Sequence, residues 1–154
     1  MAKISFNKLG LKKLNNIKTV LINDQDIEVL QYLPTEQKLE LITDVMNSCI
    51  DNNNFTNTVK FRMFMKLYII KYYTNLTFTD KQWEDPFKLY DLIEENGIYT
   101  LLENIFNTED VNCVWDDART IMDGYYSYRN SIYGIMENLS LDTDHLAEQT
   151  KEIQ

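Results

Sequence analysis

Apolar residues recur at helical spacing along the stretch 108–139, at alternating steps of four and three residues. The positions are Val111, Trp115, Ala118, Met122, Tyr125, Arg129, Ile132, Met136 and Leu139. Arg129 is the single polar member, and the pattern predicts one long amphipathic helix. Such a helix would span roughly 45 Å at 1.5 Å per residue, more than the core of one small domain requires. We therefore expect its apolar seam to contact another protein.

The stretch 58–73 is apolar on nearly all sides and is long enough for about four helical turns. It predicts a buried central helix. Because Lys60, Arg62, Lys66 and Lys71 interrupt it, the stretch is too short and too charged to span a bilayer. At 100° per residue, Lys60 and Lys71 lie roughly opposite Arg62 and Lys66, so no basic stripe is expected on this helix.

The first half of the chain carries hairpin and helix signals. β-Branched runs at 19–22 and 27–32 flank turn-forming residues at 23–26, which predicts a hairpin. A helix is expected to follow, with Thr35 able to cap it. Its apolar stripe would consist of Leu39, Ile42, Met46, Cys49 and Ile50.

The second half of the chain has clear helix boundaries. Thr79–Glu84 reads as a short helical turn, and Asp85-Pro86 predicts a capped helix that ends at Asn96-Gly97. Thr108 is expected to cap the long helix. The fold class is thus mainly α with a small N-terminal β-hairpin (α+β), a helical bundle with one long C-terminal helix. We divide the chain into a basic arm (1–18), a hairpin plus helical domain (19–139) and a polar C-terminal tail (140–154).

Charge separates the arm from the rest of the chain. The formal net charge is −9, yet residues 1–18 contain five lysines and no acid, which leaves 24 acids against 10 bases in residues 19–154. Opposite charge steers docking, so Lys3, Lys8, Lys12 and Lys13 are expected to bind an acidic protein surface, that of the chain itself or of a neighbouring copy. Nucleic acid is disfavoured because the body would repel phosphate. A merely solubilising segment is the alternative.

Residue types that carry catalysis or bind metals are sparse. Cys49 and Cys113 are far apart and are expected to be two buried, reduced thiols. His145, in the polar tail, has no nearby nucleophile, and the acidic pairs lack the glycine and glutamate of a calcium loop. The four glycines form no phosphate-binding loop. We expect no enzymatic activity, no cofactor and no metal, although an unfamiliar active site is left open.

Tyrosines cluster with an arginine in the long helix. Tyr126, Arg129 and Tyr133 combine a broad contact area with a polar tip, as the residues that dominate protein interfaces do. Arg129 would be costly to bury alone, so a partner or an internal carboxylate is expected to neutralise it. We therefore place a partner surface at these three residues. The alternative is that the tyrosines pack at the edge of the core.

The layout of the N-terminal half resembles that of a viral protein class. An extended start at Phe6–Leu11 precedes a hairpin that carries Ile27-Glu28-Val29 and ends in Tyr32-Leu33-Pro34, and a helix begins at Thr35. This order is similar, over residues 3–139, to small cytoplasmic proteins from the structural gene blocks of tailed phages of low-GC bacteria, most of all the tail assembly chaperones. The resemblance implies a non-enzymatic protein whose exposed apolar helix faces hold tail tube or tape measure subunits soluble.

Three function classes follow from the sequence. The first is a phage assembly or virion component, located in the host cytoplasm or in the virion, with phage structural proteins or copies of itself as partners in a homo- or hetero-oligomer. The second is an acidic inhibitor of a host defence or transcription protein that mimics nucleic acid. The third is an enzyme with an unrecognised site. Salt separates the first two, because a charge mimic should lose affinity as ionic strength rises. No signal peptide is visible in residues 1–14, and no membrane partner is expected.

Overall fold

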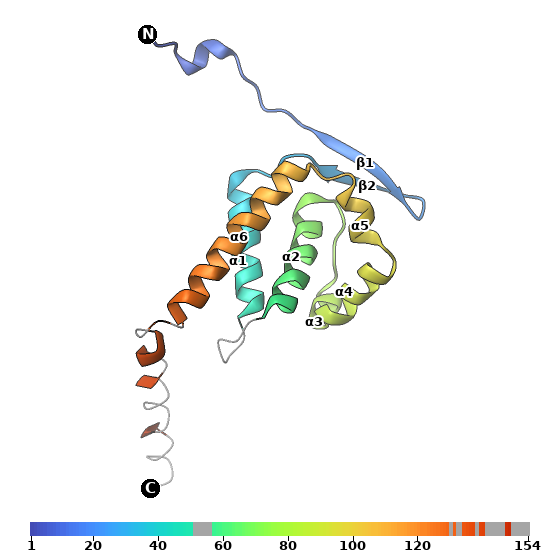
Figure 1. Ribbon diagram of the computed structural model, residues 1–154. Helices are drawn as coiled ribbons and strands as arrows, with labels where there is room; N and C mark the ends of the chain where they lie inside the picture. The colour runs from blue at the N-terminus through green and yellow to red at the C-terminus, as the bar shows by residue number, and fades with distance from the viewer. Residues whose placement is uncertain (51–56, 130, 132–133, 138, 141–146, 149–154) are drawn as a thin grey trace.

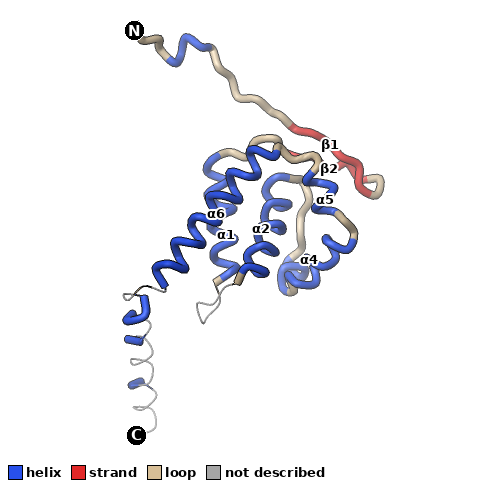
Figure 2. Tube along the Cα trace, viewed as in Figure 1, coloured by secondary structure: helices blue, strands red, loops and turns tan. Residues whose placement is uncertain are grey.

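The computed structural model shows a mainly helical α+β fold, which confirms the predicted fold class. It describes all residues except 51–56, 130, 132–133, 138, 141–146 and 149–154. A two-stranded hairpin lies across one end of a group of helices, and residues 1–16 extend away from both (Figure 1). Figure 2 shows the two strands of the hairpin at one end of the helical body.

The hairpin consists of β1 (Ile17–Ile22) and β2 (Gln25–Leu30), which pair antiparallel from Ile17 opposite Leu30 to Ile22 opposite Gln25. Asn23 and Asp24 form its turn with φ of 47° and 62°. Such a two-residue turn with positive φ at both positions matches the twist of the strands, and asparagine and aspartate tolerate it. The turn is therefore shorter than the predicted stretch 23–26, and β1 begins two residues before the predicted strand start at Thr19.

The hairpin is held against the helical body by its second strand. Ile27 and Val29 are buried. Asn75, just after α2 (Thr58–Tyr73), accepts a hydrogen bond from the Glu28 amide through its side chain, with an N–O distance of 3.0 Å. The facing strand β1 has no fully buried residue, so it forms the outer edge of the hairpin.

Helix α2 is the centre of the core, as predicted. Half of its residues are buried, on all sides of the helix: Phe61, Met63, Phe64, Met65, Leu67, Ile69, Ile70 and Tyr73. Helix α1 (Thr35–Cys49) lies beside α2, and α6 (Thr108–Arg129) runs obliquely across α1 (Figure 1). Apolar side chains of all three helices form one continuous core.

The short helices α3 (Asp80–Glu84) and α4 (Pro86–Glu95) begin and end within one residue of where the sequence predicts, and α5 (Ile98–Glu103) follows them. Thr79 and Gln82 form a reciprocal capping box at the start of α3. The Asp85 carboxylate accepts a hydrogen bond from the Lys88 amide at 3.2 Å. Gly97 adopts φ 65°, a left-handed conformation that favours glycine and ends α4.

Two predicted helix caps and one predicted stripe position are wrong. Thr35 and Thr108 are the first residues of their helices rather than the caps. Pro34 precedes α1 without a side-chain cap, and Asn107 accepts a hydrogen bond from the Asp110 amide at the start of α6. Leu39 is exposed, because α1 turns Leu41 and Val45 toward α2 instead.

The long helix is shorter than predicted. Helix α6 has 22 residues and ends at Arg129, and helical backbone reappears at residues 134–137. Ser131 lies in a bend between the two. At 1.5 Å per residue α6 spans roughly 33 Å rather than 45 Å. The continuous heptad-like spacing of apolar residues therefore does not correspond to one continuous helix.

Candidate interaction surfaces

The apolar seam of α6 packs on the chain's own body. Val111, Val114, Ala118 and Met122 are buried. The Trp115 ring contacts Phe61 of α2 edge to face, with ring centroids 6.0 Å apart. The prediction that this seam contacts another protein is therefore wrong as far as Met122, because the chain's own core covers it.

The structure places only one side chain of the predicted partner surface Tyr126, Arg129 and Tyr133. Tyr126 is half-buried and packs against the core, as the core-edge alternative requires. Arg129 ends α6, but its side chain is outside the description, and Tyr133 lies outside the described residues. The binding role of these three residues stays a prediction.

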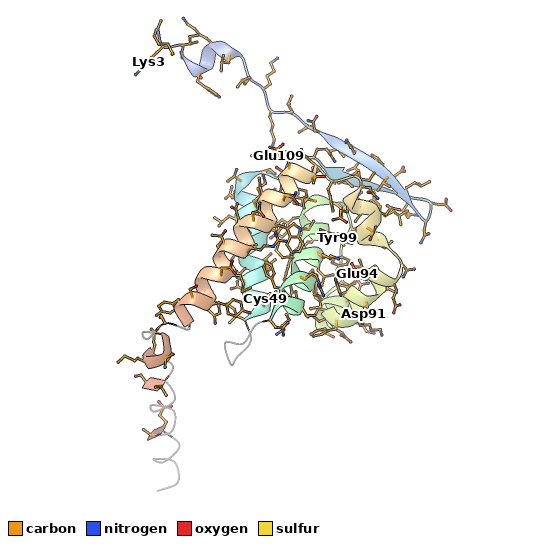
Figure 3. All side chains as sticks on the ribbon, viewed as in Figure 1. Lys3, Cys49, Asp91, Glu94, Tyr99 and Glu109 are labelled. Atoms are coloured by element: carbon orange, nitrogen blue, oxygen red, sulfur yellow. The ribbon has the colours of Figure 1, made fainter. Side chains whose placement is uncertain are left out.

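The N-terminal arm stands clear of the rest of the molecule (Figure 1). Its residues are all exposed, including Lys3, Lys8, Lys12 and Lys13. Lys3 lies at its far end, remote from the labelled acids Asp91, Glu94 and Glu109 (Figure 3). In this structure the arm therefore does not contact the chain's own acidic surface, which was one of its two expected partners. The acidic surface of a neighbouring copy is the other.

Apolar side chains of the arm are as exposed as its lysines. Six of them reach into solvent: Met1, Ile4, Phe6, Leu9, Leu11 and Leu14. At the base of the arm a hollow of about 660 Å³ continues this apolar surface between Leu14, Ile17, Leu30 and Tyr32. Isolated exposed apolar residues are ordinary, but a contiguous series marks an interaction site.

A second surface is a hollow of about 360 Å³ between α2 and α6, which we call the basic groove. Its aromatic residues are Phe61, Tyr99 and Trp115, and its cations are Arg62, Lys66 and Arg119. Phe61 and Tyr99 are buried, whereas Arg62 is exposed. The groove therefore has apolar aromatic walls beneath charged groups that reach water.

Aromatic rings hold two of the three cations in place. The Lys66 ammonium lies 4.8 Å from the centroid of the Tyr99 ring and 3.3 Å from the Glu94 carboxylate. The Arg119 guanidinium lies 5.2 Å from the centroid of the Trp115 ring. Each such cation–π contact contributes about 0.5–1 kcal/mol at an exposed site, enough to orient a flexible side chain.

Tyr99 is a neutral member of the groove. Burial raises the pKa of its hydroxyl to about 12, and a hydrogen bond with the Trp115 side chain opposes this in part. The hydroxyl therefore keeps its proton throughout the physiological pH range and adds no negative charge to the groove.

The groove continues along α6 toward Tyr126. A neighbouring hollow of about 230 Å³ shares Phe61 and Arg119 with it and adds Met122, Asp123 and Tyr126. The sequence predicted no basic stripe on α2, and that remains true of the isolated helix. The basic groove arises because α6 places Arg119 at the same hollow as Arg62 and Lys66 of α2. In the sequence, the groove is indicated only by the four-residue spacings 62–66 and 115–119, each of which puts two of its residues on one face of a helix.

A buried polar cluster centres on Asp110, which sequence analysis did not single out. Its carboxylate accepts hydrogen bonds from the Lys38 ammonium at 2.7 Å, the Tyr73 hydroxyl at 2.8 Å and the Leu33 amide at 3.1 Å. Burial and the bond to Asp110 raise the pKa of Tyr73 above its usual value near 10. Because every partner is satisfied within the fold, we assign this cluster a structural role: it ties the segment before α1 to α2 and α6.

The two cysteines differ in exposure. Cys49 is buried and Cys113 is exposed. The prediction of two buried thiols is therefore wrong for Cys113, which α6 turns away from the core. We expect native protein to react with a thiol reagent at one site per chain, and unfolded protein at two.

Cys113→Ser is the matched control for this labelling prediction. It should abolish the reaction of the native protein and leave the one at Cys49 after unfolding. Rapid labelling of both thiols in native wild type would contradict the burial of Cys49.

Within the described part of the chain, no group of three or more histidine, cysteine, aspartate or glutamate residues could hold a metal ion. The described helices include none that is long and apolar enough to cross a membrane. The acidic pair at Asp24 and Asp26 belongs to the hairpin turn and strand β2, and His145 lies outside the described residues.

Comparisons with protein-family models, curated proteins and solved structures found no match to this chain.

Proposed function

We propose that this chain is a non-enzymatic assembly or structural protein that acts through protein–protein contacts, with its N-terminal arm as the main binding element. The observation that supports the proposal is the arm itself, which extends from the body with apolar side chains and lysines exposed together. Phe6, for example, is 71% exposed. Burying a large apolar side chain is favourable by about 1.5–3 kcal/mol, so the burial of several such side chains against a partner stabilises the complex substantially.

The composition of the arm indicates the chemistry of its partner. Lys12 and Lys13 lie between Leu11 and Leu14, so charge and apolar surface alternate at close range. A partner with an acidic rim around an apolar groove would satisfy both. Nucleic acid offers phosphate but no matching apolar groove, and the acidic body would repel it.

A phage setting is the biological form of this proposal. The resemblance to tail assembly chaperones favours a phage structural protein or a second copy of this chain as the partner, in the host cytoplasm or in the virion. The arm extends away from the body, so a neighbouring subunit can contact it without displacing any part of the fold (Figure 1). The acidic inhibitor of a host defence or transcription protein is the competing function, and it would use the acidic body rather than the arm.

Removal of residues 1–13 tests the proposal. We expect the truncated chain to keep its melting temperature, because none of these residues is buried, and to lose self-association or the binding of co-expressed phage structural proteins. Native mass spectrometry and light scattering measure both outcomes. Unchanged association of the truncated chain would refute a binding role for the arm.

Two full-length variants separate the contributions of charge and apolar contact. Replacing Lys3, Lys8, Lys12 and Lys13 by glutamine should mainly slow association and reduce its salt dependence. Replacing Leu9, Leu11 and Leu14 by serine should mainly raise the dissociation rate. Salt-sensitive binding to arbitrary DNA that disappears with the arm would overturn the proposal in favour of nucleic acid.

A further inference from the structure

The basic groove between α2 and α6 is a candidate for a second binding site, independent of the arm. We propose that it binds a short acidic segment of a partner protein in which carboxylates flank an aromatic or other bulky apolar side chain. The proposal goes beyond the function given above, because the groove and the arm lie on different parts of the chain and carry different side chains.

Charge complementarity supports an acidic occupant. Three cations converge on the groove from two helices, whereas Glu103 is the one acid among the described residues that line its main hollow. Glu94 pairs with Lys66 from outside that lining.

Arg62 forms no ion pair within the part of the chain that the structure describes. Arg119 pairs with Asp116 of its own helix at 3.4 Å, but the two side chains are 58% and 74% exposed, so this pair is weak and can give way to a partner's carboxylate. Such a concentration of cations is unexpected on a chain with a net charge of −9. Guanidinium groups bind carboxylates in a bidentate manner, so Arg62 and Arg119 are suited to hold two acidic side chains.

The aromatic walls support an apolar residue between those acids. Phe61, Tyr99 and Trp115 form the interior of the groove and are fixed by the core beneath them. Aromatic pairs prefer edge-to-face or offset contacts, and Phe61 and Trp115 already adopt such an arrangement at 6.0 Å. A free inorganic anion would leave this apolar surface without a partner.

The length of the groove supports a polypeptide segment. The two hollows share Phe61 and Arg119 and together follow α6 from Asn112 to Tyr126. Fourteen residues of helix correspond to roughly 21 Å, which accommodates about six residues of extended chain. Tyr126 lies at the apolar end, so this arrangement assigns it a contact with the partner.

Single-stranded nucleic acid is the competing occupant, since bases also stack on aromatic residues beside cations. Glu103 and Asp123 each line part of the groove, and their carboxylates would repel the successive phosphates of a nucleic acid strand. A segment with only two or three carboxylates can place them on the cations and keep the acids of the groove at a distance.

A random dodecapeptide display library is the probe for the full-length chain. Peptides are selected on wild type and counter-selected on the double variant Arg62→Gln/Arg119→Gln, whose exposed sites should tolerate the change. The control Lys81→Gln/Lys88→Gln removes the same charge from exposed sites outside the groove. Thermal melting of all proteins verifies that each is folded.

We expect the selected peptides to combine Asp or Glu with an aromatic residue. A synthetic peptide of the consensus sequence should lose about tenfold or more in affinity on the groove variant and keep its affinity on the control variant. No enrichment, a basic consensus, equal binding to both variants, or preferential binding of oligo(dT) to the same groove would each overturn the proposal.

Tryptophan fluorescence gives a readout that needs no partner. In Trp83→Phe protein, Trp115 is the remaining tryptophan of the chain. Iodide should quench its emission more than caesium does, because the cations concentrate anions near the ring. The groove variant should reduce this difference and the control variant should not; equal quenching by both ions in wild type would refute a cationic groove.

Discussion

Asp110→Ala is expected to lower the free energy of unfolding by about 3–5 kcal/mol, one of the two largest effects that we predict. Removing the carboxylate leaves the buried Leu33 amide without an acceptor and the Lys38 ammonium without its counter-ion. The Tyr73 hydroxyl loses its 2.8 Å bond and keeps only the long 3.5 Å bond to the Asp110 backbone carbonyl. Each unsatisfied buried group costs about 1–3 kcal/mol, and an unpaired charge costs more. Urea unfolding of wild type and variant, followed by circular dichroism, measures the difference.

Asp117→Ala is the matched control, since it removes an exposed carboxylate from the same helix. Its effect should stay within about 0.5 kcal/mol. Asp110→Asn should fall between the two, because the amide keeps the shape and an acceptor oxygen but not the charge. If Asp110→Ala destabilised no more than Asp117→Ala, the buried cluster would not hold the three segments together.

Leu67→Ala should lower the free energy of unfolding by about 2–5 kcal/mol, and Phe64→Ala by a similar amount. Leu67 is fully buried in α2, and Phe64 is 7% exposed and stacks near Tyr68 with ring centroids 6.3 Å apart. Both substitutions create a cavity in the helix that the rest of the fold surrounds, and the neighbours can close it only in part. Thermal and urea unfolding measure the loss.

Val59→Ala provides the comparison within α2, because Val59 is 60% exposed near the start of the helix. A change of at most about 0.5 kcal/mol is expected there. An unchanged melting temperature for both Leu67→Ala and Phe64→Ala would show that α2 is not the centre of the core.

The basic groove illustrates why a surface is harder to predict than a helix. Arg62 and Lys66 lie four residues apart on α2, and Trp115 and Arg119 lie four apart on α6, so each pair is visible in the sequence. Their convergence depends on how α2 and α6 are placed against each other. Nothing local specifies that placement, because it follows from packing between residues about fifty positions apart.

The arm and the α6 seam show what an apolar pattern in the sequence leaves undecided. The seam was expected to contact another protein, but the fold buries it as far as Met122. The arm was expected to bind through its lysines, and its exposed apolar residues became apparent only when the structure showed that it leaves the body. Amphipathic periodicity reveals that a face will be buried, but it does not say whether the covering surface belongs to the same chain.

The sequence by itself determined the helical class, the hairpin, the central position of α2 and the ends of α3 and α4. These features depend on local chemistry: turn residues that accept positive φ at Asn23 and Asp24, the cap at Asp85, the glycine at Gly97, and apolar residues on all sides of one helix. Only the tertiary structure decided the Asp110 cluster, the exposure of Cys113 and the basic groove. Each requires side chains from separate elements to meet, and long-range packing, rather than any local preference, brings those elements together.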